Sequence, residues 1–297
     1  MDEILYCCSF PDFSENAETV PELLSAMDYE FSSWRDAETE KRTHTLYFKT
    51  AEEAADAGAR IRSLRDVWRG MEVEIGDPVL ADLKKEDWAE SWKIHFKPIE
   101  ISPRLAITPS WIEYPSAPGR HVITLDPGMS FGTGQHATTK FCLTQLDLFA
   151  ARQDVSALSM LDAGCGSGIL AIAAEKLGFR EICAFDIDPD ATRIAAENAG
   201  INGCSRIRFA TASLIEYNAE GKTFDVIAAN ILSSALLAGK EKLLSLLKPG
   251  GCLILAGILD REYPLVREAF EQSGCRQFAS TEENKWRGGA FLRENGI

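Results

Sequence analysis

The stretch Leu161-Asp-Ala-Gly-Cys-Gly-Ser-Gly168 decides the fold of the larger part of this chain. An apolar run over Ser159–Ala163 stops at three closely spaced glycines, and an apolar helical pattern follows at once over Ile169–Leu177. Glycines at such a junction allow a tight turn and let a ligand approach the backbone closely. The stretch therefore predicts a strand, a ligand-binding turn and a helix, which together are a building unit of an α/β sheet.

Strands and helices alternate from this turn to the end of the chain. Apolar strands are expected at Ser159–Ala163, Glu181–Phe185, Ile207–Ala210, Phe224–Ala229 and Cys252–Ala256, with helices at Ile169–Leu177, Pro189–Ala199 and Leu236–Leu247. Continuous apolar strands separated by helices are typical of a parallel sheet covered on both faces. Two strand-like stretches, Arg276–Ser280 and Trp286–Arg293, then follow with only a turn between them. We predict a mostly parallel, Rossmann-like sheet of seven strands that ends in an antiparallel hairpin.

The first 77 residues carry a different pattern. Strands are expected at Ile4–Phe10, Tyr29–Trp34, Thr43–Lys49 and from Val73–Ile75 toward Val79, with helices at Asn16–Met27 and Ala51–Trp68. The order βαββαβ is that of a split-βαβ, ferredoxin-like α+β domain. We therefore predict an N-terminal domain over residues 1–77 that is separate from the α/β domain.

A connector joins the two patterns, and we assign it residues 78–103. Its segment Lys84–Trp92 predicts a short helix that places Trp88 and Trp92 on one face, where they pack the linker onto a domain. The second domain then covers residues 104–297. Its first elements are expected strands at Leu105–Thr108 and Val122–Leu125, a loop from Asp126 to Thr139, and a helix at Lys140–Ala150.

The charge of the chain is strongly acidic and unevenly distributed. The net charge is −14, of which −10 falls in residues 1–77 and −4 in the remaining 220. Binding of a nucleic-acid phosphate backbone needs clustered Lys and Arg side chains. Because this chain is strongly acidic, we expect no direct binding of nucleic acid. The acidic N-terminal part suits either a basic partner or a merely solvated surface, and both interpretations stay open.

The eight cysteines indicate reduced thiols in a cytoplasmic protein. They are scattered, with no CxxC pair and no His at metal-ligand spacing, so no metal site is expected. Cys142, Cys183 and Cys252 lie in apolar runs, where a free Cys acts as a small buried hydrophobe. No run of about 18 apolar residues is present, and the start lacks the basic region of a signal peptide, so no membrane segment is expected.

Asp186 gives the glycine turn its chemical context. It ends the second strand of the alternating region and lies 22 residues after Gly164, close to the spacing of about 20 for an acidic residue that reaches ribose hydroxyls. The form GxGxG, rather than GxGxxG, argues against a dinucleotide and suits the phosphate-free S-adenosylmethionine better. Gly164, Gly166 and Asp186 are therefore predicted to bind this cofactor, whereas Asp188 is expected to cap the helix at Pro189.

Two further polar segments are candidates for the same site. Asn230 ends an apolar strand at the sheet edge where ligands bind, so its carbonyl could accept a hydrogen bond from an attacking amine; satisfying a local turn is the equal alternative. The loop Asp126–Thr139 contains Gly128, Gly132, Gly134 and Phe131 and could fold over a cofactor. Thr138 or Thr139 would then contact the cofactor or cap the following helix. We expect a structural role for His136.

Together these segments resemble the bacterial PrmA methyltransferases, which modify the eleventh protein of the large ribosomal subunit. The matching segments are Leu125–Thr139, Leu161–Leu170, Asp186–Pro189 and Ala229–Leu232, with weaker matches at Glu86–Lys93 and Trp286. One departure is His136-Ala-Thr-Thr139, where the family has His-Pro-Thr-Thr. The resemblance implies a class I methyltransferase domain and an N-terminal substrate-recognition domain.

The resemblance also implies an activity and its residues. It is the transfer of methyl groups from S-adenosylmethionine to lysine and α-amino groups of that ribosomal protein, free of the ribosome. By position, the cofactor residues of the family fall on Thr139, Gly164, Asp186 and Asn230, and we expect Asn230 also to orient the nucleophile. The alternatives are a methyltransferase of another protein lysine or a small amine, a nicotinamide-dependent oxidoreductase, and a non-catalytic cofactor-binding module.

Overall fold

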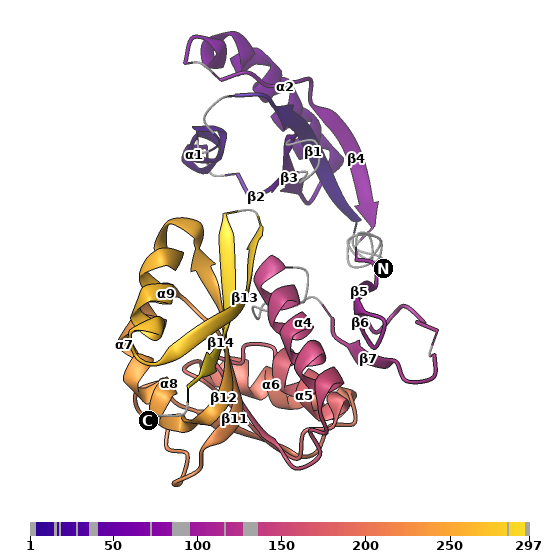
Figure 1. Cartoon of the computed structure of the whole chain (residues 1–297). Helices are drawn as coiled ribbons and strands as arrows, with labels where there is room; N and C mark the ends of the chain where they lie inside the picture. Colours follow the sequence, from indigo (N-terminus) through magenta and orange to yellow (C-terminus); the bar gives the residue numbers. More distant parts are fainter. Residues whose placement is uncertain are drawn as a thin grey trace. The chain divides into compact units, whose positions relative to one another are not determined.

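The chain forms two compact units, residues 1–95 and residues 96–297, which we call the N-terminal and C-terminal units (Figure 1). The computed structural model describes residues 4–14, 17, 19–27, 29–35, 41–71, 73–84, 96–115, 117–126, 136–283 and 285–294. The proposed linker helix with Trp88 and Trp92 lies outside these residues, as do Gly128, Phe131, Gly132 and Gly134 of the loop before Thr139.

The N-terminal unit has the predicted ferredoxin-like order. Its elements are β1 (Ile4–Asp12), α1 (Thr19–Ala26), β2 (Phe31–Arg35), β3 (Arg42–Phe48), α2 (Ala51–Arg69) and β4 (Val79–Lys84). The four strands pair antiparallel in the order β2-β3-β1-β4. Thr50 and Glu53 form a capping box that starts α2, and the buried core includes Phe10, Leu46 and Ile61.

The unit boundaries differ from those expected from the sequence. β4 pairs with β1 along residues that we had assigned to the linker, so the N-terminal sheet extends past residue 77. Of the expected strand at Val73–Ile75, only Ile75 makes a bridge, to Asp12. Because β4 is an edge strand with exposed Val79 and Leu80, it lacks the clean alternation that identifies a half-buried strand. The C-terminal unit likewise begins before Arg104, since β5 (Ile99–Ser102) pairs with β6 (Leu105–Thr108).

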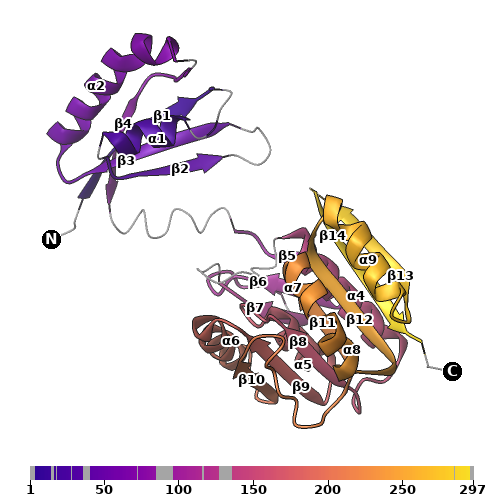
Figure 2. The same ribbon diagram turned by 90° about the vertical axis from the view of Figure 1, so that its left-hand side faces the viewer.

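The C-terminal unit is built on the predicted seven-stranded sheet. Its strands are β8 (Ser159–Ala163), β9 (Glu181–Asp186), β10 (Ile207–Thr211), β11 (Phe224–Asn230), β12 (Leu247–Leu259), β13 (Cys275–Glu283) and β14 (Trp286–Arg293). Figure 2 shows them side by side in the order β10-β9-β8-β11-β12-β14-β13. Within this sheet β14 runs opposite to the other six strands and pairs antiparallel with both β12 and β13, which confirms the expected C-terminal hairpin. A smaller sheet joins β5, β6 and β7 (His121–Thr124).

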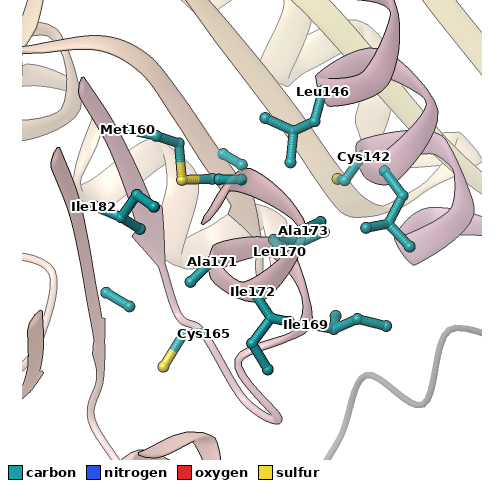
Figure 3. Close-up of a cluster of buried hydrophobic side chains, with 14 of the residues drawn as sticks. Cys142, Leu146, Met160, Cys165, Ile169, Leu170, Ala171, Ile172, Ala173 and Ile182 are labelled. Atoms are coloured by element: carbon teal, nitrogen blue, oxygen red, sulfur yellow. The ribbon is translucent and has the colours of Figure 1, made fainter. Parts of the chain in front are cut away.

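Helices cover both faces of the large sheet. One face packs against α4 (Ala137–Arg152), α5 (Ile169–Leu177) and α6 (Pro189–Ile201), and the other against α7 (Ser233–Ala238), α8 (Lys240–Leu246) and α9 (Tyr263–Glu271). In Figure 3, Cys142 and Leu146 of α4 and Ile172 of α5 belong to the same apolar cluster as Met160 of β8. Alternate residues of each strand enter the two cores, which explains the continuous apolar runs in the sequence.

Three further predictions concern a helix of this unit, the cysteines and the absence of membrane segments. The single helix expected at Leu236–Leu247 is in fact α7 and α8, which meet at Gly239. A Cβ atom at Gly239 would lie 2.1 Å from the Leu214 side chain, so the close approach requires glycine. All eight cysteines are buried and unpaired, as expected for reduced thiols. None of the helices in the described part of the chain has the length and apolar character needed to cross a membrane.

Candidate functional site

The glycine turn between β8 and α5 brings three strand ends together. Gly164, Gly166 and Gly168 have φ values of 78°, 50° and 79°, a left-handed conformation that side chains disfavour. The Gly164 N–H donates to the Phe185 carbonyl of β9 at 2.9 Å. A Cβ atom at Gly164 would lie 2.3 Å from Cγ2 of Ile231, the residue that follows β11. The turn is therefore glycine-rich both for its backbone conformation and for close packing.

Asp186 lies directly against this turn. Its Oδ2 accepts a hydrogen bond from the Gly166 N–H at 2.8 Å, and its Oδ1 accepts one from the Asp188 N–H at 3.1 Å. A carboxylate offers about four lone-pair sites, so each oxygen keeps one for a ligand. The side chain is half-buried at the end of β9 and can therefore reach a diol. The expected capping role of Asp188 is confirmed, since its Oδ1 accepts from the Asp190 N–H at 2.9 Å.

Asn230 forms the second contact between predicted site residues. At the end of β11, its Nδ2 donates to Oγ1 of Thr139 in the first turn of α4, over 3.3 Å. Its Oδ1 is buried and has no hydrogen-bond partner within the described residues. An unpaired buried carbonyl costs about 1–3 kcal/mol, so a ligand donor at this oxygen would be favourable. Gly257 keeps the space beside it open, because a Cβ atom there would lie 3.1 Å from Oδ1.

The start of α4 differs from the prediction. The helix begins at Ala137 rather than Lys140, so Thr138 and Thr139 are helical and buried and neither is an N-cap. His136 is the cap, with its Nδ1 accepting from the Thr138 N–H at 3.4 Å. Because His is not among the usual capping residues, this cap could not be predicted from the sequence. The structural role expected for His136 is thus confirmed, and burial lowers the pKa of its imidazole.

Asp162 is a site residue to which the sequence analysis assigned no role. Its side chain is fully buried beneath the glycine turn; Oδ2 accepts from the Ala171 N–H at 3.1 Å, and Oδ1 has no partner within the described residues. Burial, reinforced by the nearby charge of Asp186, raises the pKa of the Asp162 carboxyl to about 7. The signal was present in the sequence, since an acidic residue lies in the apolar stretch of β8, two positions before Gly164.

The site therefore consists of two hydrogen-bonded pairs, Gly166 with Asp186 and Thr139 with Asn230, on either side of Gly164. All of them lie at the carboxyl edge of the parallel strands or in the helix starts beside it, where open α/β sheets bind their ligands. The arrangement supplies acceptors for a diol and for an amine. Within the described ranges, no group of three or more His, Cys, Asp or Glu side chains has the geometry of a metal site.

Comparison with protein families gives a match over most of the chain. Residues 16–291 match the family model described as "Ribosomal protein L11 methyltransferase (PrmA)". Among curated proteins, the "Ribosomal protein L11 methyltransferase" of Trichlorobacter lovleyi is 45% identical over 213 residues, which are 71% of this chain and 69% of that protein. A protein of the same name from Streptococcus thermophilus is 35% identical over 290 residues, 96% of this chain and 86% of its own length.

A further relative and a solved structure show how much of each protein the similarity covers. The relative from Citrifermentans bemidjiense is 45% identical over 195 residues, but the match spans only 63% of that protein. A crystal structure described as ribosomal protein L11 methylase, from Lactobacillus delbrueckii subsp. bulgaricus, superposes with a TM-score of 0.60 at 35% identity. It covers 67% of this chain and all of the solved chain.

Proposed function

The chain belongs to the ribosomal protein L11 methyltransferase (PrmA) family, and from this premise we propose that it transfers methyl groups from S-adenosylmethionine to lysine and α-amino groups of that ribosomal protein. The observation that carries the proposal is the unpartnered, buried Oδ1 of Asn230, held at the sheet edge beside the Gly166–Asp186 pair. It is an acceptor positioned for an amine, next to acceptors positioned for a ribose.

The residues at this edge fit the cofactor. Asp186 has a free lone pair on each carboxylate oxygen, which suits two adjacent ribose hydroxyls. Gly164 and Gly166 leave the backbone accessible beside it. When bound, S-adenosylmethionine supplies a methyl group on a positively charged sulfur, which makes that methyl carbon electrophilic. The sequence predicted that Thr139 binds the cofactor. Because Thr139 has no exposed surface, we propose instead that it holds the Asn230 amide.

Asn230 would orient the nucleophile. Its Oδ1 accepts a hydrogen bond from the amine and thereby directs the nitrogen lone pair at the methyl carbon. The chain's main contribution is then proximity and alignment, which in favourable cases lower a barrier by about 7–11 kcal/mol. The lysine must arrive neutral, and its desolvation in the site favours loss of the proton to water.

The N-terminal unit is the proposed recognition domain for the substrate. Residues 1–77 carry a net charge of −10, which complements a basic ribosomal protein. We place the reaction in the cytoplasm and on the ribosomal protein before its assembly into the ribosome.

The test is incubation of the full chain with radiolabelled S-adenosylmethionine and the separated proteins of the large ribosomal subunit. We expect label in the L11 band, and a rate of labelling lower on the order of 100-fold when Asn230→Ala replaces the wild-type chain at equal concentration. Label in a different protein would overturn the substrate but not the reaction. No label, together with thermal protection by a nicotinamide dinucleotide and not by S-adenosylmethionine, would favour the oxidoreductase alternative.

A further inference from the structure

A depression of about 660 Å³ lies at the amino ends of the parallel strands, at the edge of the sheet opposite the proposed methyl-transfer site. Ten residues line it, of which one is acidic, Glu181, and five are basic: Arg180, Arg206, Arg208, Lys222 and Lys248. This composition is the reverse of that of the chain, whose net charge is −14. The depression is therefore a local concentration of positive charge on an acidic protein.

The carboxylates around the depression do not neutralise these cations. Glu181 is shared, with Lys222 Nζ at 2.7 Å and an Arg208 guanidinium nitrogen at 2.5 Å from the same oxygen. The hydrogen bond from Lys222 and the charges of Lys222, Arg208 and Lys248 hold the pKa of Glu181 below its usual range, although desolvation opposes them. One carboxylate thus faces three cations.

The remaining cations around the depression also outnumber the carboxylates that pair with them. Lys248 pairs with Asp225 at 2.7 Å and Arg206 with Glu175 at 3.4 Å. Arg180 is exposed, and no carboxylate within the described residues forms an ion pair with it. Five cations and three carboxylates leave two positive charges uncompensated. The side chains of Arg208 and Arg206 are 59% and 47% exposed, so both guanidinium groups are accessible to a ligand.

We propose that this depression binds the phosphodiester backbone of a nucleic acid. Its basic residues come from the starts of β9, β10, β11 and β12, which lie in the contiguous order β10-β9-β8-β11-β12. Neighbouring strands are about 4.8 Å apart, so five strands extend over roughly 19 Å. A row of this length matches several successive phosphates rather than one, and Arg is suited to bidentate binding of each.

The acidic total charge does not oppose this binding. Exposed charges farther apart than the Debye length, about 8 Å at physiological ionic strength, are largely screened from each other. A phosphate in the depression is therefore governed by the charged groups around it, whose sum is an excess of two positive charges. The sequence-based expectation of no nucleic-acid contact used the average charge, which contains no information on clustering in space.

The test is a fluorescence-anisotropy titration of the full chain against a labelled 20-nucleotide single-stranded RNA at 50, 100 and 200 mM NaCl. We expect saturable binding that weakens with salt, with a slope of log K against log salt of about −0.7 for each phosphate contacted. The double variant Arg180→Gln/Arg208→Gln should bind at least fivefold more weakly and reduce the slope by about 1.4, the value for two lost contacts.

The matched control is Arg267→Gln. Arg267 is 51% exposed and pairs with Glu271 on α9, outside the depression, so RNA affinity and salt slope should stay at the wild-type values. Cofactor affinity, measured for each variant, should also stay unchanged, which separates loss of the depression from unfolding. Absence of salt-dependent RNA binding by the wild-type chain, or equal binding by the double variant, would overturn the proposal.

A competition arm separates a nucleic-acid strand from free phosphate. Tripolyphosphate, added at constant ionic strength, should displace the RNA only at concentrations far above that of an unlabelled 20-mer. If tripolyphosphate displaced the RNA at the same concentration as the 20-mer, the depression would be a site for a small phosphorylated anion. This result would contradict the proposal that it binds a nucleic-acid strand.

Discussion

The side-chain amide of Asn230 donates to the hydroxyl of Thr139 over 3.3 Å, although the two residues are 91 positions apart in the chain. The bond joins the end of β11 to the first turn of α4. Since the amide nitrogen is engaged, the amide plane is held and Oδ1 is left as the free acceptor. A buried acceptor with no partner among the described residues is costly unless a ligand uses it, so the bond orients an atom for function.

Replacement of Asn230 by Ala should lower turnover much more than cofactor affinity. Without the amide the amine loses its alignment, and a misplacement of about 1 Å can cost on the order of 100-fold in rate. Calorimetric affinity for S-adenosylmethionine should change by less than about fivefold. Equal losses in turnover and affinity would contradict the orienting role.

Variants of Thr139 test the same hydrogen bond at its acceptor. Thr139→Val keeps the buried shape but removes the acceptor, so turnover should fall on the order of tenfold through the loosened Asn230. Thr139→Ser restores a hydroxyl at the same position and should recover most of that turnover. If Thr139→Val and Thr139→Ser gave the same turnover, the hydroxyl of Thr139 would not contribute and the residue would only pack in the core.

Asp186→Ala should weaken cofactor binding by about 10- to 100-fold, because charge-assisted hydrogen bonds contribute about 1.5–3 kcal/mol each. Asp188→Ala is the matched control on the same segment. It removes an N-cap at the start of α6, which should cost about 1 kcal/mol of stability and leave affinity within about twofold of wild type. Calorimetry and chemical denaturation of both variants distinguish the two roles.

The sequence predicted the core strands well because each is a short apolar run buried on both faces. It failed at β4, where Val79 and Leu80 lie exposed at a sheet edge and mimic a linker. It also placed the start of α4 three residues late, since His136 caps the helix without being a typical cap. Local patterns therefore predict buried elements better than edges and ends.

In the candidate site as well, contacts that follow from local sequence spacing were predictable, whereas contacts that depend on long-range packing were not. The pairing of Gly166 with Asp186 follows from a regular strand–turn–helix–strand spacing and was predictable. The contact between Thr139 and Asn230 depends on how α4 packs over β11, which no local pattern contains. Clustering of Arg180, Arg206 and Lys248 at one edge is likewise a product of the strand order, and the average charge concealed it.

Gly164→Ala should destabilise the C-terminal unit by about 2–5 kcal/mol. The new Cβ would lie 2.3 Å from Ile231 Cγ2, and the residue would keep a φ of 78°. Strain of the left-handed backbone costs about 1–2 kcal/mol and overpacking about 1–3 kcal/mol. Gly203→Ala is the control, because Gly203 has a φ of 68° but no atom within 4 Å of its Cβ position. In urea denaturation, Gly203→Ala should lose only about 1–2 kcal/mol of unfolding free energy, which is what the backbone strain costs. Equal losses for the two variants would show that the contact with Ile231 does not contribute.

Asp162→Asn should abolish one pH-dependent part of the stability. Burial raises the pKa of Asp162 to about 7 in the folded chain, from its ordinary value of about 3.9 in an unfolded chain. The folded state therefore holds a proton that the unfolded state releases between about pH 4 and 7, so stability is highest below this window and falls as pH rises through it. Between pH 5 and pH 8 the expected fall is about 2.7 kcal/mol, because only the two pH units below the folded-state pKa of about 7 contribute 1.36 kcal/mol each. Asn carries no charge at either pH, so the difference in unfolding free energy between wild type and variant should shift by this amount in favour of the variant at pH 8. Parallel pH profiles of the two proteins would mean that Asp162 keeps an ordinary carboxyl pKa.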